Sequence, residues 1–155
     1  MSRPNRGSGG FSAHKKQSTK SSAGHDPKEE QAISLINQGK LQEAEAIYKD
    51  LIATGTRKYV VYANLAAIYG IQKRFDETID IARKALELDP NQPQSHYNLA
   101  NAHQEKGELK AAIKSYLKAL EIKPNYPEAH TNLGNALKEQ GKLDEAIRSY
   151  ENALA

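Results

Sequence analysis

Histidine is the side chain of this sequence best suited to bind a metal ion or to move a proton. His96 and His130 stand in equivalent places of two consecutive copies of a repeated segment. A tetrahedral metal site would need further ligands, and no Asp, Glu or Cys recurs beside the two histidines to supply them. Ser, Lys and Glu are plentiful, but none has a base or a glycine-rich loop placed to activate it. We therefore expect no metal or other cofactor and no enzymatic activity.

A second set of residues could bind a partner through hydrogen bonds. Asn64, Asn98 and Asn132 recur at one constant interval, and Asn101 and Asn135 lie one helical turn after the last two. A side-chain amide can pair with both the N–H and the C=O of a peptide bond, so a ladder of asparagines could hold an extended chain independently of its side chains. The alternative is that these amides bond between neighbouring helices and serve the fold alone.

The interval between these asparagines belongs to the chain as a whole. Segment 93–121 matches segment 127–155 at 15 of 29 positions. The same shift relates both segments to 59–92 and, more weakly, to 25–58. A constant period of about 34 residues, made of two helical halves, predicts a helical solenoid.

Turn residues divide each repeat into two helices. Gly39, Gly107 and Gly141 each follow a run with apolar residues at helical spacing, where a left-handed residue can end a helix. Lys73 occupies the same place in the second repeat, so that turn must either hold a strained Lys or close differently. We expect no strands, and we expect helices at about 27–38, 41–54, 58–72, 75–88, 93–106, 109–122, 127–140 and 143–154.

The repeated region is expected to begin at Asp26. Asp can cap a helix, Pro27 fits its first position, and Glu29 lies three residues after the cap, as in a capping box. Residues 1–24 are rich in Ser, Gly and basic residues and have almost nothing to bury, so we expect them to be a disordered tail. The remaining chain then divides into four repeats: 25–58, 59–92, 93–126 and a truncated 127–155.

At its characteristic positions the repeat resembles the tetratricopeptide repeat family, and the resemblance covers residues 27–155. The family has eight such positions. In order they hold an aromatic residue; Leu; either Gly or Ala; an aromatic residue; Ala; an aromatic residue; Ala; and Pro. The third repeat has His96, Leu99, Ala100, His103, Ala112, Tyr116, Ala119 and Pro124. The second repeat has Tyr62, Leu65, Ala66, Tyr69, Thr78, Ala82, Ala85 and Pro90. The first repeat departs from the pattern at Gln31, Leu35, Leu51 and Thr56, as a terminal unit often does.

This resemblance implies an all-α fold, a right-handed superhelical solenoid of antiparallel helix pairs. It also implies that His96, His103 and His130 occupy places that the family fills with aromatic residues, so we expect these three histidines to pack. The family uses the inner surface of the solenoid, built from the first helix of each repeat, to hold an extended peptide or a partner helix. We therefore expect a protein-interaction module whose partner is a protein or peptide.

Eight residues are our candidates for the peptide-binding concave face. They are Asn64, Asn98, Asn101, Asn132 and Asn135, together with Gln94, Tyr97 and Thr131. The asparagine ladder is similar to that in the repeats of O-linked N-acetylglucosamine transferase, where stacked asparagines hold a substrate's backbone. The family's clamp for a C-terminal carboxylate needs Lys and Arg at inner positions, where this chain has Glu29, Ala63, Gln94, Tyr97 and Thr131. Capture of a chaperone's C-terminal tail is therefore disfavoured.

Charge and composition limit the other classes of function. Five basic residues and no acidic residue lie in residues 1–24, whereas the rest of the chain has 17 basic and 19 acidic residues. Such a tail supports only weak, sequence-blind binding of nucleic acid, which we consider a lesser alternative. The chain has no Cys and no apolar run of the length that spans a bilayer, which argues against disulfides, thiolate zinc sites and membrane spans, and we expect a cytoplasmic protein.

Two further expectations concern the C-terminal end. The sequence stops inside the second helix of the fourth repeat, so its last apolar face lacks the cap that such arrays usually need. We expect the chain to self-associate through this end, or further residues to cover it. In the second case the chain would be the adaptor region of a larger transferase-type enzyme whose catalytic domain lies beyond Ala155.

Overall fold

The computed structural model describes residues 26–155, which form eight α-helices and, within that range, no strand. The expected tail, residues 1–24, lies outside the described residues. All helix ends fall within one residue of the expected positions. The helices are α1 (Pro27–Asn37), α2 (Leu41–Ala53), α3 (Tyr59–Ile71), α4 (Phe75–Leu88), α5 (Pro93–Glu105), α6 (Leu109–Ile122), α7 (Pro127–Glu139) and α8 (Leu143–Leu154).

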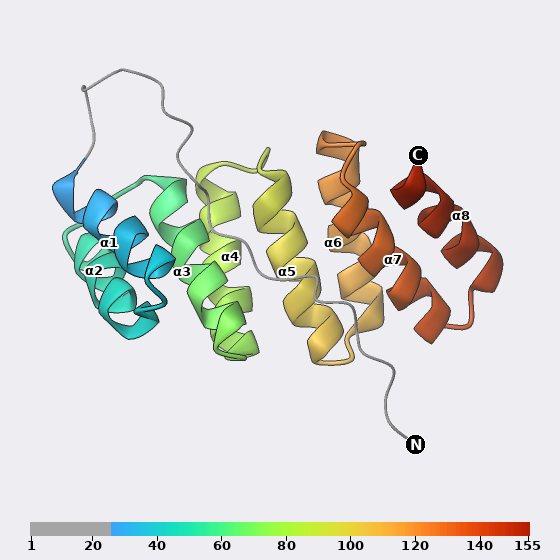
Figure 1. Ribbon diagram of the computed structural model, residues 1–155, viewed down its shortest axis with the longest axis horizontal. Helices are drawn as coiled ribbons and strands as arrows, with labels where there is room; N and C mark the ends of the chain where they lie inside the picture. The colour runs from blue at the N-terminus through green and yellow to red at the C-terminus, as the bar shows by residue number, and fades with distance from the viewer. Residues whose placement is uncertain (1–25) are drawn as a thin grey trace.

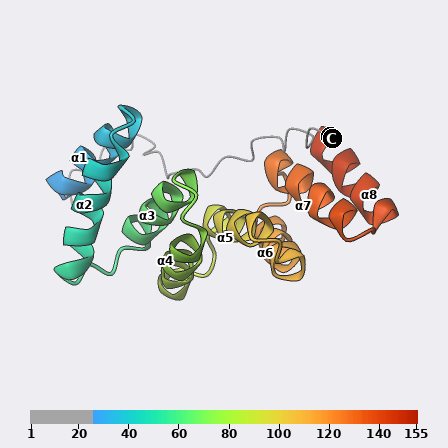
Figure 2. The same cartoon turned by 90° about the horizontal axis from the view of Figure 1, so that it is seen from below.

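Successive helices form antiparallel pairs that stack into an elongated array (Figure 1). Seen from below, α3, α5 and α7 follow one another along one side, with α4 and α6 on the opposite side (Figure 2). The array curves so that α3, α5 and α7 line its concave side (Figure 2). The expectation of an all-α helical repeat solenoid is confirmed. None of the described helices is both long and apolar enough to cross a bilayer.

The turn within each pair closes in the same way in all four repeats. Gly39, Gly107 and Gly141 have φ angles of 75°, 77° and 81°, in the left-handed region. Lys73 adopts the same conformation, with φ at 60°, and its N–H donates to the Gly70 carbonyl at 3.0 Å. Of the two expected alternatives, the second repeat therefore holds a strained Lys and does not close differently.

The core alternates small and large residues, as expected for helices that approach closely. Ala100, Ala112 and Ala119 are fully buried around Tyr116, which is itself fully buried. Tyr48 occupies the same register of the first repeat and packs against Leu65 and Ile68 in the core cluster between the first two repeats. Because each cluster is shared between neighbouring repeats, each repeat depends on the next one for its core.

The start of α1 has the expected N-cap, but the expected capping box does not form, because Asp26 bonds to Lys28 and the Glu29 side chain turns to Lys58. The Asp26 side chain accepts a hydrogen bond from the Lys28 N–H at 2.9 Å, as an N-cap does. The Glu29 carboxylate accepts a hydrogen bond from the Lys58 ammonium at 2.7 Å. Glu29 therefore ties α1 to the segment before α3.

Candidate peptide-binding surface

The structure separates the eight candidate residues into an accessible group and a buried group. The accessible group contains Gln94 at the start of α5 and Thr131 and Asn135 on α7, all half-buried. The Thr131 hydroxyl donates to the Pro127 carbonyl one turn earlier, at 3.0 Å. Thr131 and Asn135 are four residues apart, so they lie on one face of α7.

The buried group contains Tyr97 and the other four asparagines. Asn64 and Asn98 are 1% exposed, Asn101 is 5% exposed and Asn132 is 7% exposed. A buried amide must find its hydrogen-bond partners within the protein, because water cannot reach it. The expected ladder therefore exists in register, but its amides lie inside the solenoid.

The partners of Asn64, Asn101 and Asn132 lie on neighbouring helices. Asn64 Nδ2 donates to the Tyr48 hydroxyl at 3.1 Å, which joins α3 to α2 of the preceding repeat. Asn132 Nδ2 donates to the Tyr97 hydroxyl at 3.2 Å and to Asn101 Oδ1 at 3.1 Å, which joins α7 to α5. Such bonds between helices are what we expect if the asparagines serve the fold and do not bind a ligand.

Tyrosines of the second helices complete the network. The Tyr116 hydroxyl lies 2.5 Å from Asn101 Oδ1, and the Tyr150 hydroxyl donates to Asn135 Oδ1 at 2.7 Å. Sequence reasoning missed this pairing. A signal was present, because Tyr48, Tyr116 and Tyr150 share one register of the first, third and fourth repeats.

Burial raises the pKa of these tyrosines further above neutral pH. It raises the pKa of Tyr48 to about 12, although the hydrogen bond from Asn64 opposes the shift. It also raises the pKa of Tyr116 well above its usual value. A neutral hydroxyl can both donate and accept, so Tyr48 can accept from Asn64 while Tyr150 donates to Asn135.

Comparison with known families decides what this repeat is. Four models of tetratricopeptide repeats match the chain, over residues 59–92, 81–114, 105–141 and 129–155. The chain belongs to the tetratricopeptide repeat family. The expected membership is thereby confirmed.

Individual relatives are distant and longer than this chain. An Hsp70-Hsp90 organizing protein of Triticum aestivum is 26% identical over 83 residues, which are 54% of this chain and 14% of that protein. An Hsp70-Hsp90 organising protein of Plasmodium falciparum is 30% identical over 82 residues, which are 53% of this chain and 32% of that protein. The tetratricopeptide chain thus spans less than a third of the length of these curated relatives.

Solved structures with the same arrangement include crystal structures of MamA. One is 24% identical and has a TM-score of 0.78, covering 82% of this chain and 74% of that one. MamA from Desulfovibrio magneticus RS-1, residue 41 to the end, is 17% identical and has a TM-score of 0.77, covering 83% of this chain and 72% of that one. At this level of identity the likeness shows the fold.

The histidines of the tetratricopeptide repeats bond to the chain itself. Nε2 of His96 lies 2.9 Å from the Pro90 carbonyl oxygen, and Nε2 of His130 lies 2.8 Å from that of Pro124. Both contacts hold the start of a repeat against the end of the preceding one. Among residues 26–155, no group of three or more His, Cys, Asp or Glu side chains is placed to hold a metal ion.

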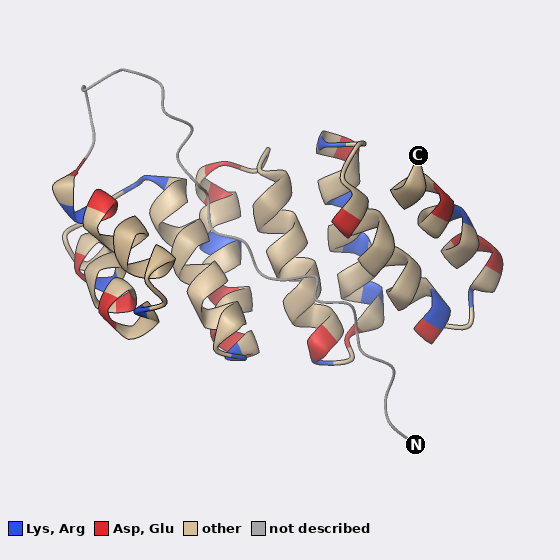
Figure 3. Ribbon diagram, viewed as in Figure 1, with Lys and Arg blue, Asp and Glu red and all other residues tan. Residues whose placement is uncertain are grey.

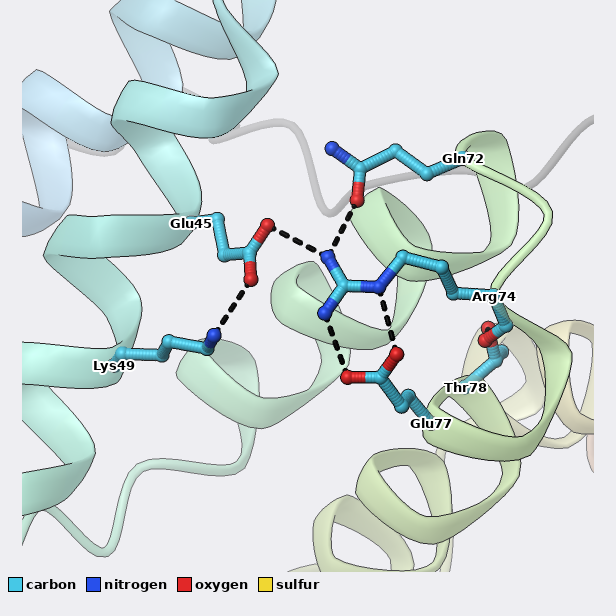
Figure 4. Close-up of polar contacts among 6 residues, drawn as sticks. All are labelled: Glu45, Lys49, Gln72, Arg74, Glu77 and Thr78. Atoms are coloured by element: carbon cyan, nitrogen blue, oxygen red, sulfur yellow. Dashed lines mark hydrogen bonds and ion pairs between the residues drawn. The ribbon is translucent and has the colours of Figure 1, made fainter.

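Sequence reasoning also missed a charged cluster between the first two tetratricopeptide repeats (Figure 4). Arg74 donates to Glu45 of α2 at 2.8 Å and, through two nitrogens, to Glu77 of α4 at 2.7 and 2.6 Å. Its guanidinium carbon lies 4.1 Å from the centre of the Tyr69 ring. Lys49 pairs with the second oxygen of Glu45 at 2.7 Å.

This charged cluster lowers the pKa of its carboxylates. Burial alone would raise the pKa of Glu45, but the hydrogen bonds from Lys49 and Arg74 outweigh it, so the pKa lies below its usual value. For Glu77 the hydrogen bond from Arg74 is the main cause of a lowered pKa. The cluster is therefore charged at neutral pH and links the divergent first repeat to the second.

Proposed function

We propose that this tetratricopeptide array is a protein-interaction module that binds an extended peptide along the concave side lined by α3, α5 and α7. The names of the curated relatives, which are organising proteins, support a binding role rather than a catalytic one. Gln94, Thr131 and Asn135 supply the accessible polar groups. The buried asparagines and Tyr97 hold the helices that present those groups.

One observation carries this proposal. Asn132 bonds to both Tyr97 and Asn101, so α7 is held against α5 by side chains that a ligand does not need to touch. The spacing between Gln94 on α5 and Thr131 on α7 is thereby fixed before a ligand arrives. A preorganised surface loses less conformational entropy on binding than a flexible one.

The chemistry of the inner positions favours an uncharged peptide segment over a terminal carboxylate. The positions where the family's clamp has Lys and Arg hold Glu29, Ala63, Gln94, Tyr97 and Thr131. Amide and hydroxyl groups can pair with peptide N–H and C=O groups. We therefore propose that the surface reads the backbone of an internal segment, in a cytoplasmic partner protein.

A peptide selected from a random display library on the full chain provides the ligand for the test. We expect a variant with Gln94→Ala, Thr131→Ala and Asn135→Ala to bind it about 10- to 1,000-fold more weakly, because three hydrogen bonds are lost. The matched control carries Asp80→Ala, Arg83→Ala and Lys84→Ala on the exposed face of α4. Fluorescence anisotropy gives both affinities.

Backbone recognition adds a second readout to the same test. N-methylation of the central amides of the selected peptide should weaken binding more than alanine substitution of its side chains. Equal affinities of the triple variant and the unaltered chain would contradict the proposed surface. Sensitivity to side chains alone would contradict backbone recognition.

A further inference from the structure

A hollow lies on the exposed side of α6, away from the proposed peptide-binding surface. Its volume is about 720 Å³, and it is largely open to solvent, as a surface groove is. The turn between α7 and α8 forms its other wall. The lining residues are Lys110, Ile113, Lys114, Leu117, Lys118, Glu121, Gln140 and Lys142.

The floor of this hollow is apolar and its rim is basic. Leu117 is 52% exposed although it is a large apolar residue, and Ile113 beside it is half-buried. Lys110, Lys114 and Lys118 follow one another at intervals of four residues, which is about 6 Å along the helix axis. Figure 3 shows the blue segments that recur along α6.

Most of this positive charge is not neutralised within the described residues. Between Asp26 and Ala155 no ion pair involves Lys110, Lys114 or Lys142, and Lys118 has only a long contact of 3.4 Å with the exposed Glu121. Four lysines therefore face one carboxylate around an apolar floor. Such a surface attracts a ligand that presents negative charge on both sides of apolar groups.

The equivalent surfaces of the neighbouring repeats differ. The positions on α4 that correspond to the α6 stripe carry three acidic and two basic residues, and Ile79 there is buried. The corresponding positions on α8 carry two acidic residues and one basic residue. The basic and apolar combination is thus specific to α6 and does not follow from the repeat pattern.

We propose that this basic hollow on α6 is a second binding site, which takes an acidic amphipathic helix of a partner protein. The partner's apolar stripe packs on Ile113 and Leu117, and its carboxylates, spaced four residues apart, pair with Lys110, Lys114 and Lys118. Glu121 ends the basic stripe, so the partner's acidic stretch ends there as well. This is recognition of a helix in a groove.

Shape and polarity favour a helix over the other anionic ligands. A membrane surface is flat and cannot fill a hollow between a helix and a neighbouring turn. Nucleic acid presents phosphates that would pair with the lysines but leave Leu117 uncovered. A helix with an apolar stripe between acidic residues satisfies the floor and the rim together.

The test uses the full chain and a synthetic helical peptide with leucines along one face and glutamates beside them at four-residue intervals. Lys114→Gln with Lys118→Gln removes two positive charges from the hollow. Arg83→Gln with Lys84→Gln removes the same charge from α4 and is the matched control. We expect the first variant to weaken binding about 2- to 30-fold and the control to leave it unchanged.

Four further measurements test the same site. Leu117→Gln should weaken binding as well, because it removes the apolar floor, and circular dichroism should show that all variants keep their helices. The variant at Gln94, Thr131 and Asn135 should bind the acidic peptide with unchanged affinity. This result would show that the α6 site and the proposed peptide-binding surface are separate, so each proposal can be tested without the other. A version of the peptide with lysines in place of glutamates should not bind.

Several outcomes would overturn the proposal. They are the absence of saturable binding of the acidic peptide, equal losses in the test variant and its α4 control, and unchanged binding in the Leu117→Gln variant. Phosphatidylserine vesicles and a single-stranded oligonucleotide are measured in parallel. Binding of either one that depends on Lys114 and Lys118, without binding of the peptide, would reassign the hollow to that ligand.

Discussion

The hydroxyl group of Tyr116 lies 2.5 Å from Oδ1 of Asn101, fifteen residues earlier in the chain. Tyr150 and Asn135 have the same relationship in the next repeat, at 2.7 Å. The second helix of each of these repeats is therefore bonded to the first helix through a tyrosine and an asparagine. Asn132 then extends the network from one repeat to the previous one.

Asn132→Ala should destabilise the fold. The substitution removes the donor to Tyr97 and Asn101 and takes a hydrogen bond from the buried Tyr97 hydroxyl, at a cost of about 1–3 kcal/mol in the free energy of unfolding. Thermal unfolding should show a melting temperature several degrees lower. Thr131→Ala, at the neighbouring half-exposed position, is the control and should change stability by less than about 0.5 kcal/mol.

The triple variant Asn64→Ala, Asn98→Ala and Asn132→Ala separates architecture from recognition. Because all three side chains are buried, we expect a large loss of melting temperature and retained binding of the selected peptide at temperatures where the variant is folded. Loss of binding with unchanged melting would instead show that the asparagine ladder itself holds the ligand.

Acid should weaken the link between the first two repeats. The pKa of Glu45 is lowered in the folded chain, so its charge stabilises the fold above its unfolded pKa of about 4.5, and this contribution is lost as the pH falls through the lowered value. Glu45→Gln should cost about 1–2 kcal/mol at pH 7, since the Glu45 side chain is only 12% exposed. The difference from the unaltered chain should shrink below about pH 4.5.

Denaturant unfolding followed by circular dichroism at pH 7 and pH 3 measures this effect. Glu77→Gln is the control, because that side chain is 51% exposed and solvent screens its pair with Arg74. Glu77→Gln should lower the free energy of unfolding at pH 7 by less than Glu45→Gln does. A pH-independent difference for Glu45→Gln would mean that its contribution is packing and not charge.

The turn at Lys73 should become more stable with glycine. A non-glycine residue in the left-handed region costs about 1–2 kcal/mol, and the greater freedom of glycine in the unfolded chain offsets part of the gain. Lys73→Gly should therefore stabilise the fold by about 0.5–1 kcal/mol in chemical denaturation.

Gly107→Lys is the reciprocal variant, and it should lower the free energy of unfolding by about 1 kcal/mol. A Cβ atom at Gly107 would meet nothing within 4 Å, so this change tests backbone conformation without a steric clash. If both substitutions leave stability unchanged, the left-handed conformation at this turn carries no measurable strain.

The outer face of α8 should promote self-association. Leu143, Ile147 and Leu154 are 59%, 54% and 89% exposed, whereas Leu109, Ile113 and Leu120 at the same register of α6 are partly buried against the core. We expect sedimentation to show oligomers that dissociate on dilution, and Leu143→Lys with Ile147→Lys to yield a monomer. A monodisperse monomer of the unaltered chain at high concentration would contradict this expectation.

The sequence alone determined the elements of this protein, because helix ends depend on local interactions. The residues that set them are glycines or Lys73 in left-handed turns, Asp26 and Pro27 at the first helix, and apolar residues at helical spacing. Each of these acts within a few residues of its own position. The constant repeat period then set the order of the repeats and the register of the asparagines.

Only the tertiary structure decided which of those asparagines face solvent. Asn132 and Asn135 lie on the same helix, yet the first reaches Tyr97, 35 residues away, and the second remains half-exposed. The pairing of Arg74 with Glu45 likewise joins residues 29 positions apart. Such contacts depend on how neighbouring helix pairs rotate against each other, and that rotation results from the packing of all their side chains together.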